Sequence, residues 1–134
     1  MIRTILKNAR WEQAQDATIL DDAVARDLLD TLAANAAACV GMAANMIGVN
    51  KRIIVFRDGL QNRLMMNPRI VEASEPYRVP EGCLSLEGER IANRFKQITV
   101  EWQDESMKRH SERFSGYAAQ IIQHEIDHTN GIMI

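Results

Sequence analysis

The sequence predicts an α+β fold in which small mixed antiparallel sheets pack around a C-terminal helix, with one amphipathic helix nearer the N-terminus. Three observations support this fold class. A helical repeat of apolar residues covers positions 22–38, several strand-like segments follow between 51 and 104, and a second helical pattern ends at Asn130 and Gly131. Because the strands follow one another without helices between them, antiparallel sheets are favoured over alternating βαβ units. The length of 134 residues predicts a single domain over residues 1–134.

The first helix is predicted over about residues 22–38. Val24, Leu28 and Leu32 repeat every four residues, so they share one face of a helix. Acidic residues at its start suit the positive end of the helix dipole. Residues 1–17, by contrast, show no regular pattern, and we expect them to wrap the surface.

Four segments in the middle of the chain have the composition of strands or of the turns between them: KRIIVFRD, DGLQN, RLMMNPRIVEAS and KQITVEWQD. The first is apolar and β-branched, which is typical of a buried strand, and the second has the composition of a hairpin turn. Pro68 has no N–H to donate, so we expect it at a sheet edge or a bulge. Ile98, Val100 and Trp102 alternate with polar residues, as in a strand with one solvated face. Residues 77–95 are expected to be extended and rich in turns.

The segment SERFSGYAAQIIQHEIDHTNG is predicted to form the second helix, with Ser115 as its N-cap. His124 and His128 are four residues apart, so on a helix they lie one turn apart on the same face and can bind one metal ion. Glu125 can still reach a water on that ion, as in the H-E-x-x-H pattern. The alternative is a pair of surface histidines favoured by the helix dipole. The isoleucines around them favour the inward orientation.

A catalytic metal site needs a third protein ligand, and the sequence offers several. The candidates are His110, Cys39, Cys83 and a carboxylate. His110 lies in a charged segment that we expect to be an exposed loop. Cys83 follows Pro80 and a glycine, where the backbone can turn and present a thiolate, although a small buried core residue is the alternative interpretation. We do not expect a disulfide between the two cysteines, because nothing indicates an oxidising compartment.

Composition excludes several classes of function. The net charge is -2 and the basic residues are scattered, so no direct nucleic-acid binding is expected. No stretch approaches 18 apolar residues, and the N-terminus lacks the apolar core of a signal peptide. We therefore expect a cytoplasmic protein that does not bind membranes.

Taken together, GMAANMIG, EGCLS and QHEIDH resemble the three motifs of the peptide deformylase family, in the same order and across essentially the whole chain. The resemblance implies a metal-dependent hydrolase of protein biosynthesis. Such an enzyme removes the N-terminal formyl group from N-formylmethionyl peptides and releases formate. Its expected partners are nascent chains near the ribosome.

The resemblance also implies roles for particular residues. Cys83, His124 and His128 would hold one divalent metal ion, with ferrous iron as the expected native ion and zinc, nickel or cobalt able to replace it. Glu125 would act as general base and then as general acid. The backbone N–H of Leu84 would stabilise the oxyanion together with the metal and, in the family, a glutamine side chain.

Further residues are expected around the substrate cleft: Val40, Gly41, Met46, Gly82, Gln120 and Ile121. The small size of the glycines would let a peptide backbone approach closely. On the last helix, Asp127 is expected to pair with Arg90 or Arg94, the alternative being a solvated surface charge.

The chain departs from the family pattern at Met46, which occupies the glutamine position of the first motif. Methionine cannot donate a hydrogen bond, and losing one oxyanion donor typically costs about 10²–10³ in rate. Three interpretations stay open. Asn45 takes the donor role, another side chain or a water substitutes with slow activity, or the protein has lost or changed its activity.

Two classes of function therefore remain. The first is a deformylase; a zincin-type peptidase is a related enzyme, but Cys83 argues against it because those sites are usually completed by His or Glu. The second is a deformylase-like protein that binds metal or formyl-peptides without turnover. Glu125 favours an enzyme, since a purely structural metal site has no need of it.

Overall fold

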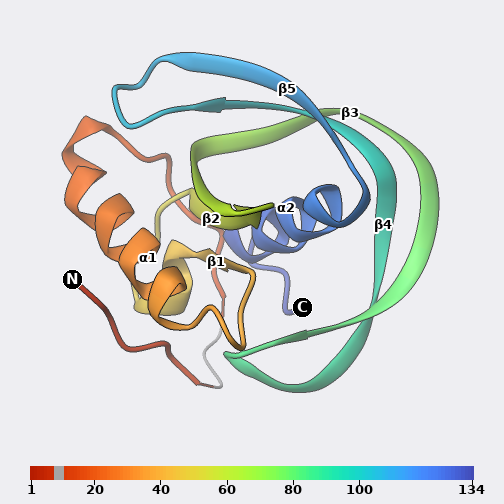
Figure 1. Cartoon of the computed structure of the whole chain (residues 1–134), viewed down its shortest axis with the longest axis horizontal. Coiled ribbons are helices and arrows are strands. Elements are labelled where there is room, and N and C mark those ends of the chain that lie inside the picture. Colours follow the sequence, from red (N-terminus) through yellow and green to blue (C-terminus); the bar gives the residue numbers. More distant parts are fainter. Residues whose placement is uncertain (8–10) are drawn as a thin grey trace.

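The computed structural model describes residues 1–7 and 11–134. Within them the chain forms helix α1, a five-stranded antiparallel sheet in the order β1-β2-β3-β4-β5, and helix α2 (Figure 1). The elements are η1 (Ile19–Asp21), α1 (Asp22–Ala34), β1 (Gly41–Ala43), η2 (Ala44–Ile47), β2 (Ile53–Asp58), β3 (Gln61–Cys83), β4 (Leu86–Gln103), β5 (Arg109–Ser115) and α2 (Gly116–Thr129). The α+β fold class predicted from the sequence is confirmed.

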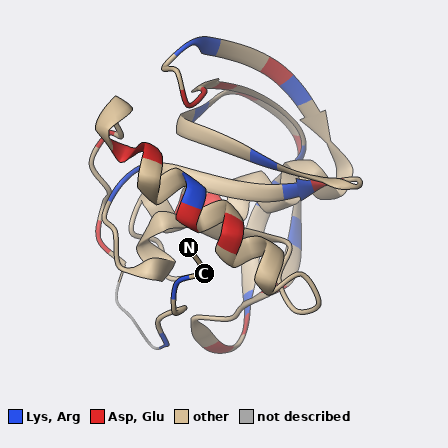
Figure 2. Cartoon of the chain, turned by 60° about the vertical axis from the view of Figure 1, so that its left-hand side comes forward, with Lys and Arg blue, Asp and Glu red and all other residues tan. Residues whose placement is uncertain are grey.

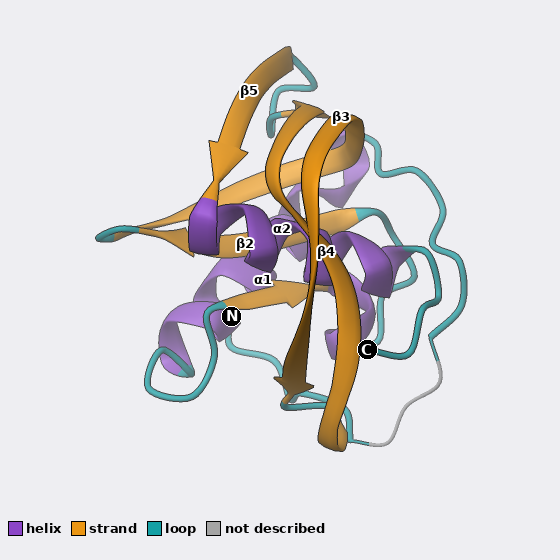
Figure 3. Cartoon of the chain, turned by 90° about the vertical axis from the view of Figure 1, so that its right-hand side faces the viewer, coloured by secondary structure: helices purple, strands orange, loops and turns teal. Residues whose placement is uncertain are grey.

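The long hairpin of β3 and β4 positions the site. Its two strands run together as one curved ribbon, seen from the side in Figure 3, and they bend around α2. The ribbon ends in a tight turn where Cys83 pairs with Leu86. The sheet register shifts between Met66 and Arg69, so Pro68 lies at a bulge as predicted. This geometry brings the end of β3 back over the C-terminal half of α2.

Strand β2 separates two hydrophobic clusters because its side chains alternate between the faces of the sheet. Ile53 and Val55 pack in a cluster with Leu28 and Leu32 of α1. Ile54 and Phe56 pack in the other cluster, which includes residues of α2. The sheet is thus covered by one helix on each face, and the apolar face predicted for the first helix is confirmed, with Leu28 and Leu32 buried and Val24 partly buried.

Helix α1 is shorter than the predicted 22–38, because it ends at Ala34. Asn35 is the reason. Its side-chain Nδ2 donates to the carbonyl oxygen of Thr31 at 2.8 Å, and its backbone N–H donates to the same turn. An asparagine that satisfies the last carbonyls in this way ends a helix even where alanines follow.

Two expectations for residues outside the motifs were wrong. The segment 1–17 does not only wrap the surface, since Trp11, Ala14 and Ala17 are buried; residues 8–10 of that segment lie outside the described residues. His110 is in strand β5 instead of a loop, and its ring stacks on Trp102 with centroids 5.3 Å apart. The first error arises because the burial of Trp11, Ala14 and Ala17 depends on contacts that are distant in the sequence, and the second because the pairing of β5 with β4 could not be inferred from the charged composition of the segment.

The second helix begins directly after Ser115, which is its N-cap residue, although the Ser115 side chain makes no capping hydrogen bond. Ser115 and the six residues before it are paired with β4 as strand β5. Charged residues of both signs are interspersed over the surface (Figure 2). None of the helices in the described part of the chain is long and apolar enough to cross a membrane.

Candidate metal centre

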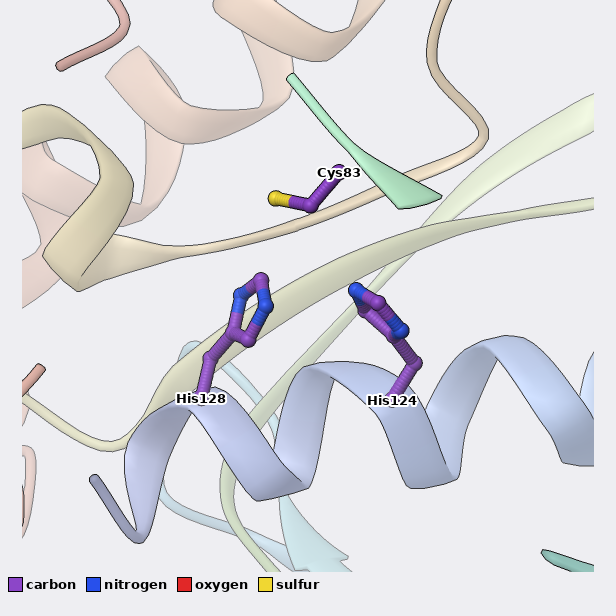
Figure 4. A group of neighbouring side chains, drawn as sticks. All are labelled: Cys83, His124 and His128. Carbon is purple, nitrogen blue, oxygen red and sulfur yellow. The ribbon is translucent and has the colours of Figure 1, made fainter. Parts of the chain in front are cut away.

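Cys83, His124 and His128 converge at one point. Each offers one ligand atom, and these atoms all lie within 4.8 Å of one another. Figure 4 shows the two imidazoles rising from α2 toward the thiol at the end of β3. The histidines are buried, so they face inward as the sequence predicted. Of the candidates for a third ligand, Cys83 is the one that joins the histidines within the described residues.

The group opens onto a cleft of about 750 Å³. The structure gathers around it nearly all the residues that the sequence singled out; His128 lies behind the cleft wall, fully buried. Those that line the cleft are Val40, Gly41, Met46, Gly82, Cys83, Leu84, Gln120, Ile121, His124 and Glu125. Their contacts with a substrate stay predictions.

The two cysteines, both free, have opposite electrostatic environments. Burial opposes the charge of the Cys83 thiolate, but the neighbouring imidazoles of His124 and His128 outweigh it and lower the pKa of Cys83 to about 6. Burial raises the pKa of Cys39 to about 11, and the charge of Glu125 acts in the same direction. The Cys39 thiol donates to the carbonyl oxygen of Gly41 at 2.9 Å. Cys83 is therefore the cysteine whose thiolate form is available to bind a cation.

Glu81 orients His124. Its Oε1 lies 2.7 Å from Nδ1 of His124, which leaves Nε2 of that ring for a metal. Arg94 donates two hydrogen bonds to the same carboxylate, at 2.9 and 2.6 Å, and a third to Asp127 at 2.6 Å. Burial disfavours the carboxylate, but the bonds from His124 and Arg94 lower the pKa of Glu81 to about 2. The predicted pairing of Asp127 is confirmed, with Arg94 as its partner.

Sequence reasoning missed Glu81, although it is the first residue of EGCLS. Its position two residues before Cys83, a predicted metal ligand, could have indicated it. Its partners could not be found in this way, because Arg94 is 13 residues away and His124 is 43 residues away. Gln120 also donates to Glu81, at 3.0 Å, so this residue of the cleft wall touches the group that orients His124.

The polar atoms around His128 fit a bound cation. Nε2 lies 2.9 Å from the main-chain oxygen of Ile134. Nδ1 lies 3.2 Å from Oε1 of Glu125, and both atoms are buried without a hydrogen-bond partner among the described residues. Buried polar atoms without partners are rare in proteins. A cation and its coordinated water are the partners that an imidazole nitrogen and a carboxylate oxygen would take here.

Without the cation the charges of the group balance one another. Burial disfavours protonation of His124, but hydrogen bonds with Cys83 and Glu81 raise its pKa to about 9. Burial acts in the same way on His128, but the charges of Glu125 and Cys83 raise its pKa to about 10. Protonation of the two imidazoles supplies the positive charge that a bound metal ion would otherwise supply.

Gly41 makes room for Glu125. A Cβ at this position would lie 2.6 Å from Cγ2 of Ile121 and 2.9 Å from Oε2 of Glu125, closer than real atoms approach. The glycine therefore leaves room for the side chains of both Ile121 and Glu125. A Cβ at Gly82 would find its nearest neighbours at 3.7 and 3.8 Å, an ordinary contact. The expected approach of a peptide to either glycine stays a prediction.

The first motif settles one of the open interpretations. Asn45 does not take the donor role, because its Nδ2 donates to the carbonyl oxygen of His128 at 2.7 Å and the residue does not line the cleft. Met46 does line the cleft, and its Sδ accepts from the N–H of Ala43 at 3.5 Å. The side-chain amide of Asn45 thus bonds the first motif to α2. It does not replace the glutamine that is missing at position 46.

Comparisons with known proteins agree with this geometry. A family model described as polypeptide deformylase matches residues 3–134. A peptide deformylase of Clostridium beijerinckii is 46% identical over 136 residues, which cover 100% of each chain. One of Pseudothermotoga lettingae is 36% identical and is covered over 72% of its length. The crystal structure of a peptide deformylase from Thermotoga maritima has a TM-score of 0.88 at 29% identity, covering 99% of this chain and 95% of that one. A peptide deformylase structure from Legionella pneumophila has a TM-score of 0.87 at 31% identity, covering 99% of this chain and 83% of that one.

Proposed function

Since the chain belongs to the peptide deformylase family, we propose that Cys83, His124 and His128 hold one divalent metal ion, and that Glu125 transfers the proton of the reaction. The reaction is the family's hydrolysis of the N-terminal formyl group of nascent peptides, with release of formate. The proposal for the residues rests on one observation above the others. Three donors from two distant segments meet within 4.8 Å, with a carboxylate at their side.

The donor set favours a transition metal with an open coordination position. One thiolate and two imidazoles suit iron, zinc, nickel and cobalt, and we propose ferrous iron as the native ion. Three protein donors leave a position for water or substrate, as in other catalytic sites. The bound ion would supply Lewis-acid chemistry and lower the pKa of a water molecule.

The position of Glu125 supports a role in proton transfer. It lines the cleft, and its Oε1 has no hydrogen-bond partner among the described residues. We propose that this carboxylate accepts a proton from the attacking water and returns it to the amine that leaves. The neighbouring Gly41 keeps the carboxylate in place by having no side chain there.

The oxyanion has fewer donors here than the family pattern provides. We propose that it is held by the backbone N–H of Leu84, which lies in the turn directly after Cys83. Met46 supplies no hydrogen bond. We therefore expect a slower enzyme than one with glutamine at this position. The second candidate, a metal-binding relative with altered turnover, is favoured by this one substitution.

The substrate proposal follows from the cleft. Val40 and Ile121 give it apolar walls suited to the methionine side chain, and Gln120 adds a polar one. We propose that the peptide is an N-formylmethionyl chain met near the ribosome in the cytoplasm. The family match over 3–134 supports treating residues 1–134 as one domain.

Metal analysis tests the proposed ligands. Protein purified without oxygen should contain close to one equivalent of iron or of another transition metal. Cys83→Ala and His128→Ala should each lose it while remaining folded by circular dichroism. The matched control is Cys39→Ala, which removes the other cysteine of the cleft and should keep the metal. A folded Cys83→Ala protein with undiminished metal content would overturn the assignment.

A further inference from the structure

We propose that Trp11 is a positioning residue for the ligand His128: it holds the imidazole in the orientation that binds the metal. The inference rests on the proposed role of His128. The ring centroids of Trp11 and His128 are 5.2 Å apart, with the ring planes tilted by 36°. Both residues are buried, and the pair belongs to segments more than 100 residues apart.

The surroundings of His128 show why the indole matters. Its imidazole packs edge-on against His124 at 4.6 Å between centroids, and its Nε2 is bonded to the main chain of Ile134. Nδ2 of Asn45 donates a hydrogen bond to the backbone carbonyl oxygen of His128. Trp11 covers the ring itself. Whereas His124 is oriented by the carboxylate of Glu81, His128 is oriented by an aromatic face and a carbonyl oxygen.

The backbone fixes Trp11 to the same end of α2. The N–H of Ala14 donates to the carbonyl oxygen of Thr129 at 2.7 Å, and Gln13 forms a bridge with Asn130. Gly131 lies under this segment with a φ of +78°, and a Cβ there would come within 3.1 Å of the backbone nitrogen of Gln13. The indole is therefore placed by tight main-chain contacts to the residues that directly follow His128.

The N-terminal segment also contacts the other two motifs of the site. The N–H of Leu6 donates to the carbonyl oxygen of Met46 at 2.9 Å, and Nζ of Lys7 donates to that of Leu84 at 2.8 Å. A segment without apolar periodicity thus touches all three motifs. Groups that orient ligands in this way typically change metal affinity about 10–100-fold when they are removed.

Trp102 offers a closely matched control. It is 7% exposed, as is Trp11, and its ring stacks on a histidine, His110, with centroids 5.3 Å apart. His110 is not part of the metal group. Loss of either indole should destabilise the fold through the cavity it leaves. Only the loss of Trp11 should change how the metal is held.

The experiment measures the dissociation constant for Ni²⁺ by calorimetry, and the absorption spectrum of the Co²⁺ form, in metal-free protein reloaded with each ion. Trp11→Leu and Trp11→Met should bind Ni²⁺ about 10–100-fold more weakly and shift the cobalt bands. Trp11→Phe, which keeps an aromatic face, should restore most of the affinity. Trp102→Leu should lose stability in urea but keep the wild-type affinity and spectrum. If Trp11→Leu does not fold, the Ni²⁺ affinities and cobalt spectra of Trp11→Met and Trp11→Phe are compared instead.

The outcomes separate this inference from the function it rests on. If the wild-type protein binds no Ni²⁺, or if Cys83→Ala binds it equally well, the proposed metal centre fails. If the wild type binds Ni²⁺ at that centre and the Trp11 and Trp102 variants have the same affinity and cobalt spectrum, Trp11 is only a core residue and the inference is overturned.

Discussion

Nδ1 of His124 lies 2.7 Å from Oε1 of Glu81, and both groups are buried. The same carboxylate accepts two hydrogen bonds from Arg94, a residue only 4% exposed. One acidic residue therefore orients His124, a proposed metal ligand, and neutralises the buried guanidinium of Arg94. Losing the negative charge should affect both the metal and the fold.

We predict that Glu81→Gln weakens Ni²⁺ binding about 10–100-fold, because the histidine loses the anion that orients it. The substitution should also lower the free energy of unfolding by about 3 kcal/mol, since Arg94 is left with one charged partner in the interior. Calorimetric titration and urea unfolding of the metal-free protein measure the two effects.

The matched control is Glu101→Gln, which breaks the pair between Arg69 and Glu101. That pair has a distance of 3.0 Å but is 71% and 49% exposed. Glu101→Gln should lower the free energy of unfolding by less than about 1 kcal/mol and leave the metal affinity unchanged. Equal effects of the two substitutions would show that Glu81 has no special relation to the metal centre.

Met46→Gln should increase turnover. Because one oxyanion donor is typically worth about 10²–10³ in kcat, the gain could reach about 10²-fold if the new amide faces the cleft. Met46→Leu, which keeps an apolar side chain and adds no donor, is the control and should leave kcat close to that of the wild type. A rate unchanged by glutamine would mean that another group already stabilises the oxyanion.

Alkylation by iodoacetamide should distinguish the cysteines by pH in the metal-free protein. The thiolate is the reactive form, and the pKa of Cys83 is lowered to about 6, so its rate should rise through pH 6 and level off above it. Cys39, with a pKa raised to about 11, should stay unreactive over the same range. Mass spectrometry of the alkylated peptides measures each site.

Two results would check the assignment of these thiols. Cys83→Ser should abolish alkylation below pH 9, and addition of Ni²⁺ to the wild type should protect Cys83. If the midpoint for Cys83 were close to the ordinary thiol value of 9.0, the two histidines would not be stabilising its thiolate.

Gly41→Ala should impair the protein in two ways. The added Cβ would lie 2.6 Å from Ile121 and 2.9 Å from Glu125, so it should displace the carboxylate and cost about 1–3 kcal/mol in stability. We expect a lower kcat and a lower urea midpoint. Gly82→Ala, where the nearest atom is 3.7 Å away, should fold with nearly the wild-type midpoint. Full activity of Gly41→Ala would contradict the proposed position of Glu125.

The sequence indicated the parts of the site that lie within short motifs. The spacing of His124 and His128 placed both on one helix face, and the turn residues around Cys83 indicated a backbone that can turn and present a thiolate. It could not indicate contacts that only the tertiary fold creates. The bond from Asn45 to His128 spans 83 residues, and nothing near Asn45 in the chain marks its partner.

The fold shows the same division. The apolar run of β2 and the alternation along β4 indicated the buried residues directly, whereas the end of α1 depended on a local bond from Asn35 that competes with helix propensity. The N-terminal segment was the hardest to interpret, because it has no periodicity and is buried only through docking against α2 and the first motif.

The most direct measurement is formate release from formyl-Met-Ala-Ser by protein purified without oxygen and loaded with iron, nickel or cobalt. We predict catalytic release by the wild type, while Glu125→Ala binds the metal and releases no formate above background. If no metal form of the wild type exceeds Glu125→Ala, the protein is not an active deformylase, and the metal centre built on Cys83, His124 and His128 serves another purpose.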